Sequence, residues 1–287
     1  MKKKDCNDPK RMPDLPADDS GLYLPFYYHS IASLWMYFSV DLDILYPFLE
    51  ETGLKPGVFD GKGLVNINFM NYTAHNGNSL AATSELELNI IAFPAAKADR
   101  VPSISAACYL SGQDQTKTLG NYRVHVPCDN PFAVEAGKSL FGENKFVANF
   151  AYKVPSINLP PQKVWNFTIS DDNKKVILGV TADFHKLVPG IANPTPIINY
   201  SMKNSRLVGS RRNYLFAAQN YMPLSKSDQK KIVVNIGNSP KENMAADLAA
   251  ILGKDSKGNA KTPAIAIQVI QSLPVIIESR SFYAGFS

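Results

Sequence analysis

The sequence has little of what metal centres, disulfide frameworks and membrane spans require. Its three cysteines, Cys6, Cys108 and Cys128, form no CxxC pair, and its four histidines show no HxH or HExxH spacing. We therefore expect no metal site. A sparse, odd number of cysteines is typical of a reducing compartment. No run of about 18 apolar residues is present, although a transmembrane helix needs one.

Charge of either sign is also sparse. Charged residues make up 19% of the chain, the net charge is +5, and the basic residues stand singly or in short groups. Nucleic-acid-binding proteins gather such residues on one face, so we expect no nucleic-acid partner. Lys2 to Lys4 resemble the start of a signal peptide, but the polar stretch from Asp5 to Arg11 replaces its apolar region. These features predict a cytoplasmic protein with no membrane partner.

Hydrophobic residues are abundant, at 45% of the 287 residues. A chain of this length and composition buries a substantial core. Residues 1–22 are polar and contain Pro9, Pro13 and Pro16, so we predict an arm there without a core of its own. Residues 23–287 are predicted to form one domain.

The apolar residues alternate with polar ones over many short stretches. Leu64–Tyr72 and Ser84–Phe93 predict an antiparallel pair around the loop at Gly77. Helices are expected only after Asp41, to Leu49, and over Glu242–Leu252. Closely spaced strands with few helices favour a meandering antiparallel sheet or barrel. The other predicted strands are Ile31–Val40, Ile104–Leu110, Tyr122–Pro127, Phe146–Tyr152, Val164–Ser170, Val176–Ala182, Ile197–Met202, Tyr214–Ala218 and Ile232–Asn235. Ala264–Ile270 and Val275–Tyr283 are predicted to be strands or irregular core segments.

One lysine stands inside an apolar stretch, at the junction of a turn and a strand. Phe141 to Asn144 contain a glycine and an asparagine, which tolerate turn geometry, and Lys145 follows them. If Lys145 is buried, desolvation lowers the pKa of its amine by up to roughly 3–5 units. The free amine would then attack a ketone or aldehyde and form a Schiff base. The alternative is an ordinary solvated lysine.

The stretch from Asp129 to Lys145 resembles the segment that supplies the Schiff-base lysine of acetoacetate decarboxylases. The shared order is Asp129-Asn130, an apolar run, Gly137-Lys138, an aromatic residue and Lys145. This resemblance implies a mainly β fold, an antiparallel cone-like β-barrel with a few short peripheral helices. It also implies a homo-oligomer and a carboxy-lyase that acts on a small oxo-acid, such as a 3-oxo acid. No organic cofactor is expected, because the lysine itself supplies the electron sink.

The same resemblance assigns roles to residues of the predicted pocket. Lys145 is the expected nucleophile, and Glu85 corresponds to a pocket glutamate that moves a proton or orients the substrate. Glu87 shares a strand face with Glu85 and is expected to bind the substrate or to take the role of Glu85, whereas a solvated face is the other interpretation of both glutamates. Phe141 and Phe146 are the expected apolar contacts of the substrate.

Three departures from the family pattern keep other functions open. Asn144 replaces a proline, Phe146 replaces a second lysine, and no arginine occurs between Arg11 and Arg100 to hold a substrate carboxylate. That clamp could come from Arg206, Arg211 or Arg212, which are otherwise solvated loop charges. The alternatives are an aldolase-dehydratase that uses the same lysine, a non-catalytic small-molecule-binding barrel, and a purely structural oligomer.

Overall fold

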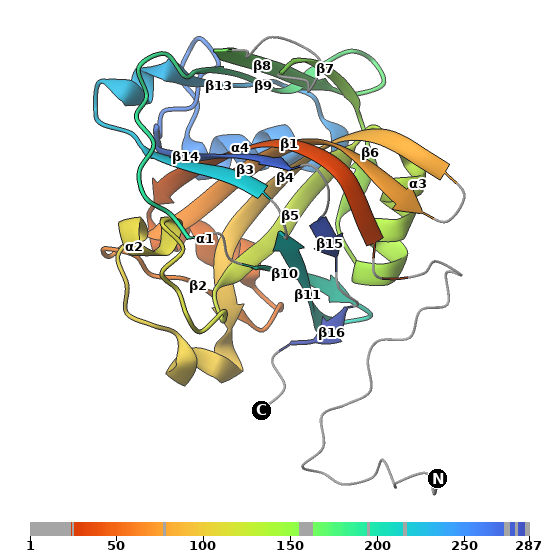
Figure 1. Cartoon of the computed structure of the whole chain (residues 1–287), viewed down its shortest axis with the longest axis vertical. Coiled ribbons are helices and arrows are strands. Elements are labelled where there is room, and N and C mark those ends of the chain that lie inside the picture. The colour runs from red at the N-terminus through yellow and green to blue at the C-terminus, as the bar shows by residue number, and fades with distance from the viewer. Residues whose placement is uncertain are drawn as a thin grey trace, which may run out of the picture.

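The computed structural model describes residues 24, 26–76, 79–154, 163–193, 196–214, 217–272, 276–278 and 281–284. The predicted arm over residues 1–22 and the centre of the loop at Gly77 lie outside these ranges. The described part is mainly β with a few short helices, as the alternating sequence predicted (Figure 1).

Strands of two sheets make up most of the molecule, and the helices are short. The larger sheet contains β1 (Phe26–Val40), β2 (Leu54–Pro56), β3 (Gly63–Asn76), β4 (Ser79–Pro94), β5 (Gly120–Cys128), β6 (Lys145–Val147), β10 (Ile197–Lys203), β11 (Arg206–Tyr214), β12 (Ala217–Pro223), β14 (Ala264–Ser272), β15 (Ile276–Glu278) and β16 (Phe282–Tyr283). The smaller sheet contains β7 (Asn149–Lys153), β8 (Val164–Ser170), β9 (Val176–Asp183) and β13 (Ile232–Ile236). The α-helices are α1 (Leu42–Leu49), α2 (Ala106–Leu110), α3 (Pro131–Ala136) and α4 (Met244–Leu252), and single helical turns are η1 (Ala95–Arg100), η2 (Gly137–Phe141), η3 (Asp228–Lys231) and η4 (Lys241–Asn243).

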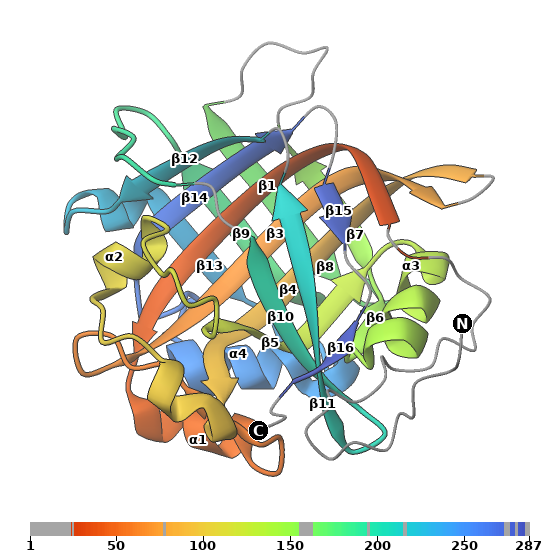
Figure 2. The ribbon, with the colours of Figure 1, turned by 60° about the horizontal axis from the view of Figure 1, so that its bottom comes forward.

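The larger sheet is built around three long antiparallel strands. β1 pairs with β3 over most of its length, β3 pairs with β4, and β4 pairs with β5. β5 then pairs in parallel with both β10 and β6. β11 pairs with β10 and β15, and β15 also pairs with β1. Figure 2 shows these strands side by side, with β6 next to α3.

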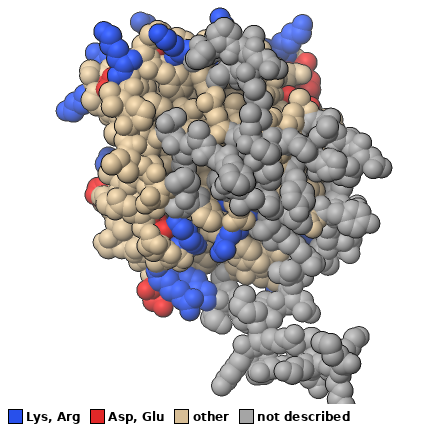
Figure 3. All heavy atoms as spheres, viewed as in Figure 1, with Lys and Arg blue, Asp and Glu red and all other residues tan. Residues whose placement is uncertain are grey.

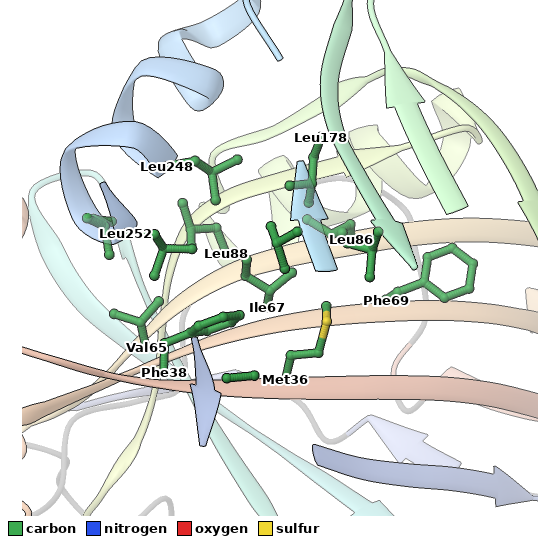
Figure 4. Close-up of a cluster of buried hydrophobic side chains, with 14 of the residues drawn as sticks. Met36, Phe38, Val65, Ile67, Phe69, Leu86, Leu88, Leu178, Leu248 and Leu252 are labelled. Atoms are coloured by element: carbon green, nitrogen blue, oxygen red, sulfur yellow. The ribbon is translucent and has the colours of Figure 1, made fainter. Parts of the chain in front are cut away.

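The main core lies between the two sheets, and α4 closes it. Alternate residues of β1, β3 and β4 face β8, β9 and α4, which is the period expected of strands with one buried face (Figure 4). The rings of Phe69 in β3 and Phe167 in β8 stack with centroids 4.3 Å apart. Leu248 and Leu252 of α4 are fully buried in the same cluster.

The opposite face of the same strands is buried as well, but it is mixed: a second apolar cluster, with Trp35 and Met70 among its members, adjoins a row of buried polar side chains. Glu85, Glu87 and Asn89 alternate along β4 with Leu86 and Leu88, as predicted, and none is more than 2% exposed. The interpretation of Glu85 and Glu87 as a solvated face is therefore wrong. Buried charges need partners, so this face is the place to look for a chemical site.

Several of the expected strands differ in the structure. Tyr214–Ala218 covers the end of β11 and the start of β12, and Val275–Tyr283 contains the separate strands β15 and β16; residues 215–216, 275 and 279–280 lie outside the described ranges. Residues 104–110 do not form a strand: Ser105 caps the short helix α2, and its side chain accepts a hydrogen bond from Cys108 N at 3.2 Å. The stretch from Phe146 to Tyr152 is divided between β6 and β7, which belong to different sheets. The chain changes sheets at Ala148, whose N–H donates to the carbonyl of Cys128.

Basic side chains are dispersed on the face shown in Figure 3. Among its coloured residues, Lys and Arg stand in separate groups at the upper end, along the left edge and at the lower end. Within the described residues, no helix is long and apolar enough to cross a bilayer.

Candidate active site

The segment that carries Lys145 is fixed to the end of β4 by two side chains. Asp129 accepts a hydrogen bond from Ser84 N at 2.8 Å, and Asn130 Nδ2 donates to Thr83 Oγ1 at 3.0 Å. Asn130 also caps α3, and Pro131 occupies the first helical position, where its missing N–H costs nothing. The Asp-Asn pair of the sequence therefore places α3 directly beside Glu85.

A tight turn then delivers Lys145 to the edge of the sheet. Gly142 ends η2 with φ +70°, and a Cβ there would stand 2.3 Å from Met202 O, so only glycine fits. Asn144, which stands where the family has proline, ties the turn to β5 by donating to Val124 O at 2.9 Å. Lys145 opens β6 and pairs with Val126 of β5.

The Lys145 amine is buried against two carboxylates. Its side chain is 7% exposed, its Nζ donates to Glu85 Oε2, and Glu143 Oε2 lies 3.6 Å from the same nitrogen. Tyr72 OH donates to Glu85 Oε2 at 3.1 Å. The structure therefore brings together Lys145 and Glu85, the two residues expected to act in catalysis, and the interpretation of Lys145 as a solvated lysine is wrong.

Burial alone does not set the charge of Lys145. Desolvation lowers the pKa of the amine, as expected from the sequence, but the carboxylate of Glu85 raises it through charge and through a hydrogen bond. The net result is a pKa above the ordinary value of lysine, which corrects the prediction of a free amine at rest. The resting site holds an ammonium–carboxylate pair, so a proton must leave Nζ before it can attack a carbonyl.

Glu87 belongs to a second charged group beside the first. Its Oε1 lies 3.1 Å from Arg123 and 3.5 Å from Arg212, and its Oε2 accepts hydrogen bonds from Asn68 and Asn89 at 3.1 and 3.0 Å. Burial raises the pKa of Glu87, but the two guanidinium groups and the amides outweigh it and lower the pKa to about 2. This carboxylate is therefore held ionised, which suits a structural anchor better than a proton carrier.

Arg123 links the two groups. Its NH1 contacts Glu143 Oε1 while its NH2 pairs with Glu87. A bulge in the β4–β5 pairing, between Asn89↔Arg123 and Leu88↔His125, sends these two β5 side chains to opposite faces. His125 is buried on the face toward α4, where its Nε2 lies 2.6 Å from Asp247 Oδ2.

A cavity of about 40 Å³ opens between α3, η2 and the inner face of the sheet. Its charged lining comprises Glu85, Arg123, Glu143, Lys145 and Arg212, and its remaining lining is Phe26, Tyr28, Tyr72, Thr83, Asn130, Ala133, Ala136, Gly137 and Phe141. One water molecule needs about 10–15 Å³ of such space, so the cavity has room for a small molecule.

The remaining expected residues divide between the cavity and its surroundings. Phe141 lines the cavity. Phe146 instead belongs to the main core, with its ring 6.3 Å from that of His125, and it is not among the residues of the wall. Of the three late arginines, Arg212 lines the cavity, whereas Arg211 is exposed and Arg206 stacks on Tyr283 at 3.4 Å.

Sequence reasoning missed three groups of the site. The sequence predicts a turn at Glu143 and no role for its side chain. Its spacing of two residues from Lys145 nevertheless places both side chains on one face of an extended segment. Arg123 and Tyr72 lie in alternating strands, where no signal shows that the polar face turns inward.

Several solved structures of enzymes have a similar fold. The enduracididine biosynthesis enzyme MppR matches with a TM-score of 0.62 at 11% identity, over 92% of this chain and 89% of that one. An acetoacetate decarboxylase-like enzyme from Sphingomonas wittichii RW1 matches with a TM-score of 0.59 at 13% identity, over 90% and 92%. Acetoacetate decarboxylase from Legionella pneumophila matches with a TM-score of 0.58 at 10% identity, over 97% and 92%. The chain has the acetoacetate decarboxylase-like fold.

The likeness is one of structure. No protein-family model matches the sequence, and no curated protein matches it either. The family resemblance read from the segment around Lys145 is thus confirmed at the level of the fold. At these identities the acetoacetate decarboxylase-like fold does not by itself assign an activity.

The chemistry available to this site is that of an amine and proton carriers. Across the described residues, no three His, Cys, Asp or Glu side chains gather as a metal site would require. The amine of Lys145 has a carboxylate in contact and a second one nearby, so it can exchange protons within the cavity.

Proposed function

We propose that this protein is an enzyme that joins Lys145 to the ketone of a small oxo-acid as a Schiff base and decarboxylates 3-oxo acids. The position of the amine is the observation that supports this most. It lies in the wall of a small cavity and contacts a carboxylate that can take its proton. The fold neighbours include acetoacetate decarboxylases, which adds support.

The reaction begins with a proton transfer inside the resting ion pair. Lys145 passes a proton to Glu85, and the free amine attacks the ketone carbon to give a carbinolamine. Glu85 returns the proton to the carbinolamine oxygen, which leaves as water. The product is an iminium whose positive charge lies beside two carboxylates, and these stabilise it.

Loss of carbon dioxide then discharges the iminium. The bond between the carboxylate carbon and its neighbour breaks, and its electron pair forms the carbon–carbon double bond of an enamine. The enamine carbon takes up a proton, and water hydrolyses the restored iminium to release a ketone and the amine of Lys145. No metal or organic cofactor takes part in this scheme, because the iminium accepts the electron pair.

The substrate carboxylate needs a positive group, and we propose Arg212 with Arg123 for this role. Both line the cavity, and both share the single carboxylate oxygen Glu87 Oε1. A guanidinium group binds a carboxylate with fixed geometry. These two side chains would replace the early arginine that the sequence lacks. Glu87 then acts on the substrate only through them.

A second candidate reaction is aldol condensation with dehydration. It uses the same iminium but needs a second group that takes and returns protons. Glu143, 3.6 Å from Lys145 Nζ, is such a group. One structure of MppR contains the condensation product of pyruvate and imidazole 4-carboxaldehyde.

The cone-like barrel and the homo-oligomer are also proposals. The pairing of β15 with both β1 and β11 supports the barrel.

The test measures turnover and oxygen exchange with a panel of oxo-acids. Acetoacetate, longer 3-oxo acids, pyruvate and other 2-oxo acids are incubated in ¹⁸O-labelled water, and carbon dioxide release and ¹⁸O in the ketone are followed. Schiff-base formation and hydrolysis exchange the ketone oxygen whatever follows. We expect both signals with a 3-oxo acid, their loss in Lys145→Ala, and their retention in Lys138→Ala, which changes an exposed lysine seven residues earlier.

Three results would change the conclusion. Oxygen exchange with 2-oxo acids and no carbon dioxide release from any 3-oxo acid would favour the aldol reaction. Binding that survives in Lys145→Ala, with no exchange in the wild type, would favour the non-catalytic binding protein. If no acid binds and none exchanges its ketone oxygen, the proposal that the protein is an enzyme is wrong.

A further inference from the structure

Glu143 has a buried carboxylate oxygen with no hydrogen-bond partner among the described residues. Its carboxylate is 2% exposed, and Oε1 is held by Arg123 NH1. Oε2 is buried, accepts no hydrogen bond from any described group, and lies 3.6 Å from Lys145 Nζ. A carboxylate oxygen that is buried without a donor is costly, so its retention beside a reactive amine calls for an explanation.

We infer that Glu143 Oε2 is the base that moves the proton on the carbon next to the Lys145 iminium. This inference rests on the proposed function, because it requires the iminium. In this scheme Glu85 and Glu143 have different roles in proton transfer. Glu85 exchanges protons with nitrogen and with the carbinolamine oxygen, and Glu143 exchanges them with carbon.

The distances from the amine divide these roles. Glu85 Oε2 is in hydrogen-bond contact with Nζ and also accepts from Tyr72 OH, so its lone pairs are directed at these two donors. Glu143 Oε2 is just beyond hydrogen-bond reach of Nζ. The carbon next to the iminium carbon lies two bonds from Nζ, so an oxygen at that separation from Nζ is within reach of this carbon. A general base must stand within reach of the proton it takes, and Glu143 meets this condition.

The proton transfer is balanced within the site. The C–H bond next to the iminium breaks, and its electron pair becomes the double bond of the enamine. The C=N electron pair returns to nitrogen, so the positive charge disappears, and Glu143 becomes a carboxylic acid. The reverse transfer from Glu143 to the enamine carbon restores the iminium. No oxidant or reductant is involved.

Two neighbours keep Glu143 in this position. Arg123 holds Oε1, which leaves Oε2 turned toward Lys145. Gly137 of η2 provides the space, because a Cβ at Gly137 would stand 2.5 Å from both Glu143 Oε2 and Lys145 Cδ. Arg123 and Gly137 are thus positioning residues for this base.

The experiment separates carbon chemistry from Schiff-base formation. Wild type, Glu143→Gln and Glu143→Ala are incubated in deuterium oxide with an oxo-acid or a ketone product that the wild type accepts, and deuterium uptake next to the carbonyl is followed by NMR. In parallel, borohydride trapping with peptide mass analysis measures the Lys145 adduct. A general base contributes about 10²–10⁴-fold, so we expect deuterium uptake to fall by at least about 100-fold in both variants while trapping persists. Added formate should restore uptake in Glu143→Ala.

Each other outcome counts against the inference. Deuterium uptake at the wild-type rate in Glu143→Gln, with Lys145 still trapped, would show that Glu143 is not the base. If both variants lose the Lys145 adduct as well as deuterium uptake, and formate restores neither, Glu143 has only a structural role. A wild type that gives no Lys145 adduct with any acid would overturn the proposed function and this inference with it, whereas the first two outcomes leave the proposed function standing.

Discussion

At the scale of single residues, the site is a set of buried charges in which each side chain has several partners. Lys145 stands between Glu85 and Glu143, and Arg123 connects Glu143 to Glu87. Buried ion pairs of this kind are weak evidence for stability but are strongly destabilising when one partner is removed. The network therefore fixes the position and the charge of the amine more than it stabilises the fold.

Glu87 gives the clearest dependence on pH. Its pKa is about 2 in the folded protein and 4.5 in the reference state, so its ionised form stabilises the fold above pH 4.5. That stabilisation, on the order of 3 kcal/mol, is lost as the pH falls from 4.5 to about 2. We expect Glu87→Gln to lower the free energy of unfolding by a similar amount at pH 7, and the difference from wild type to shrink toward pH 2. Urea unfolding across this range measures both.

The control for this experiment is Glu50→Gln, which removes an exposed carboxylate. It should change the free energy of unfolding by no more than about 0.5 kcal/mol. A gap between wild type and Glu87→Gln that stayed constant down to pH 2 would show that the charge of Glu87 contributes nothing, and that the variant acts through packing.

At the scale of elements, α3, η2 and the turn at Gly142 decide where the amine lies. The helical segment presses its Gly137 against Glu143 and Lys145, and the left-handed Gly142 redirects the chain into β6. Neither contact depends on the strands alone. If another segment replaced α3, η2 and the turn at Gly142, the same strands would not hold the Lys145 amine beside Glu85.

Gly137→Ala tests this dependence. Gly137 has helical angles, φ −61° and ψ −43°, so alanine suits the backbone, but the new methyl group would displace the ends of Glu143 and Lys145. A misplacement of about 1 Å at a reacting group can cost about 100-fold in rate, and we expect a loss of that order in the rate of borohydride trapping. The melting temperature should change little.

Gly179→Ala is the matched control. The nearest atoms to its added methyl group are 3.7 and 3.9 Å away, which is ordinary contact. It should leave trapping unchanged. An unimpaired trapping rate in Gly137→Ala would mean that η2 does not position the site.

The sequence predicted strands better than it predicted what joins them. Alternation located β3, β4, β5, β8 and β9 because each has one apolar face, which is a local signal. Alternation failed at residues 104–110, where the cap at Ser105 begins a helix. It also failed at Ala148, where one apolar stretch is divided between two sheets. Lys145 and Glu85 were found through family resemblance. Arg123 was not, because its partners Glu87 and Glu143 are distant in the sequence and meet it only after folding. Glu143 was not either, although its spacing of two residues from Lys145 is a local signal.

At the scale of the whole molecule, the two faces of the larger sheet have different tasks. One face packs on the smaller sheet and α4 with apolar side chains, and the other carries the charged site. The core between the sheets, together with the apolar cluster beside the site, supplies the hydrophobic stabilisation that offsets the cost of burying six charged groups. Substitutions in the core between the sheets should therefore lower stability without changing the chemistry of Lys145.

Phe167→Ala separates the two faces. The ring of Phe167 is 1% exposed and stacks on Phe69 across the two sheets. Its removal should lower the free energy of unfolding by about 3–5 kcal/mol, measured by urea unfolding. Trapping of Lys145 in the folded protein should persist. The control Val233→Ala, at a residue 43% exposed, should cost far less. Equal losses in both variants would contradict the assignment of the core to this interface.

The central claim is that the buried amine of Lys145 forms a covalent bond with the carbonyl of an oxo-acid. Borohydride reduction in the presence of the acid, followed by peptide mass analysis, tests it most directly. The account predicts a stable mass increase of the reduced adduct on the peptide that contains Lys145, absent without the acid and absent in Lys145→Ala. An adduct confined to other lysines, or no adduct with any 2-oxo or 3-oxo acid, would contradict it.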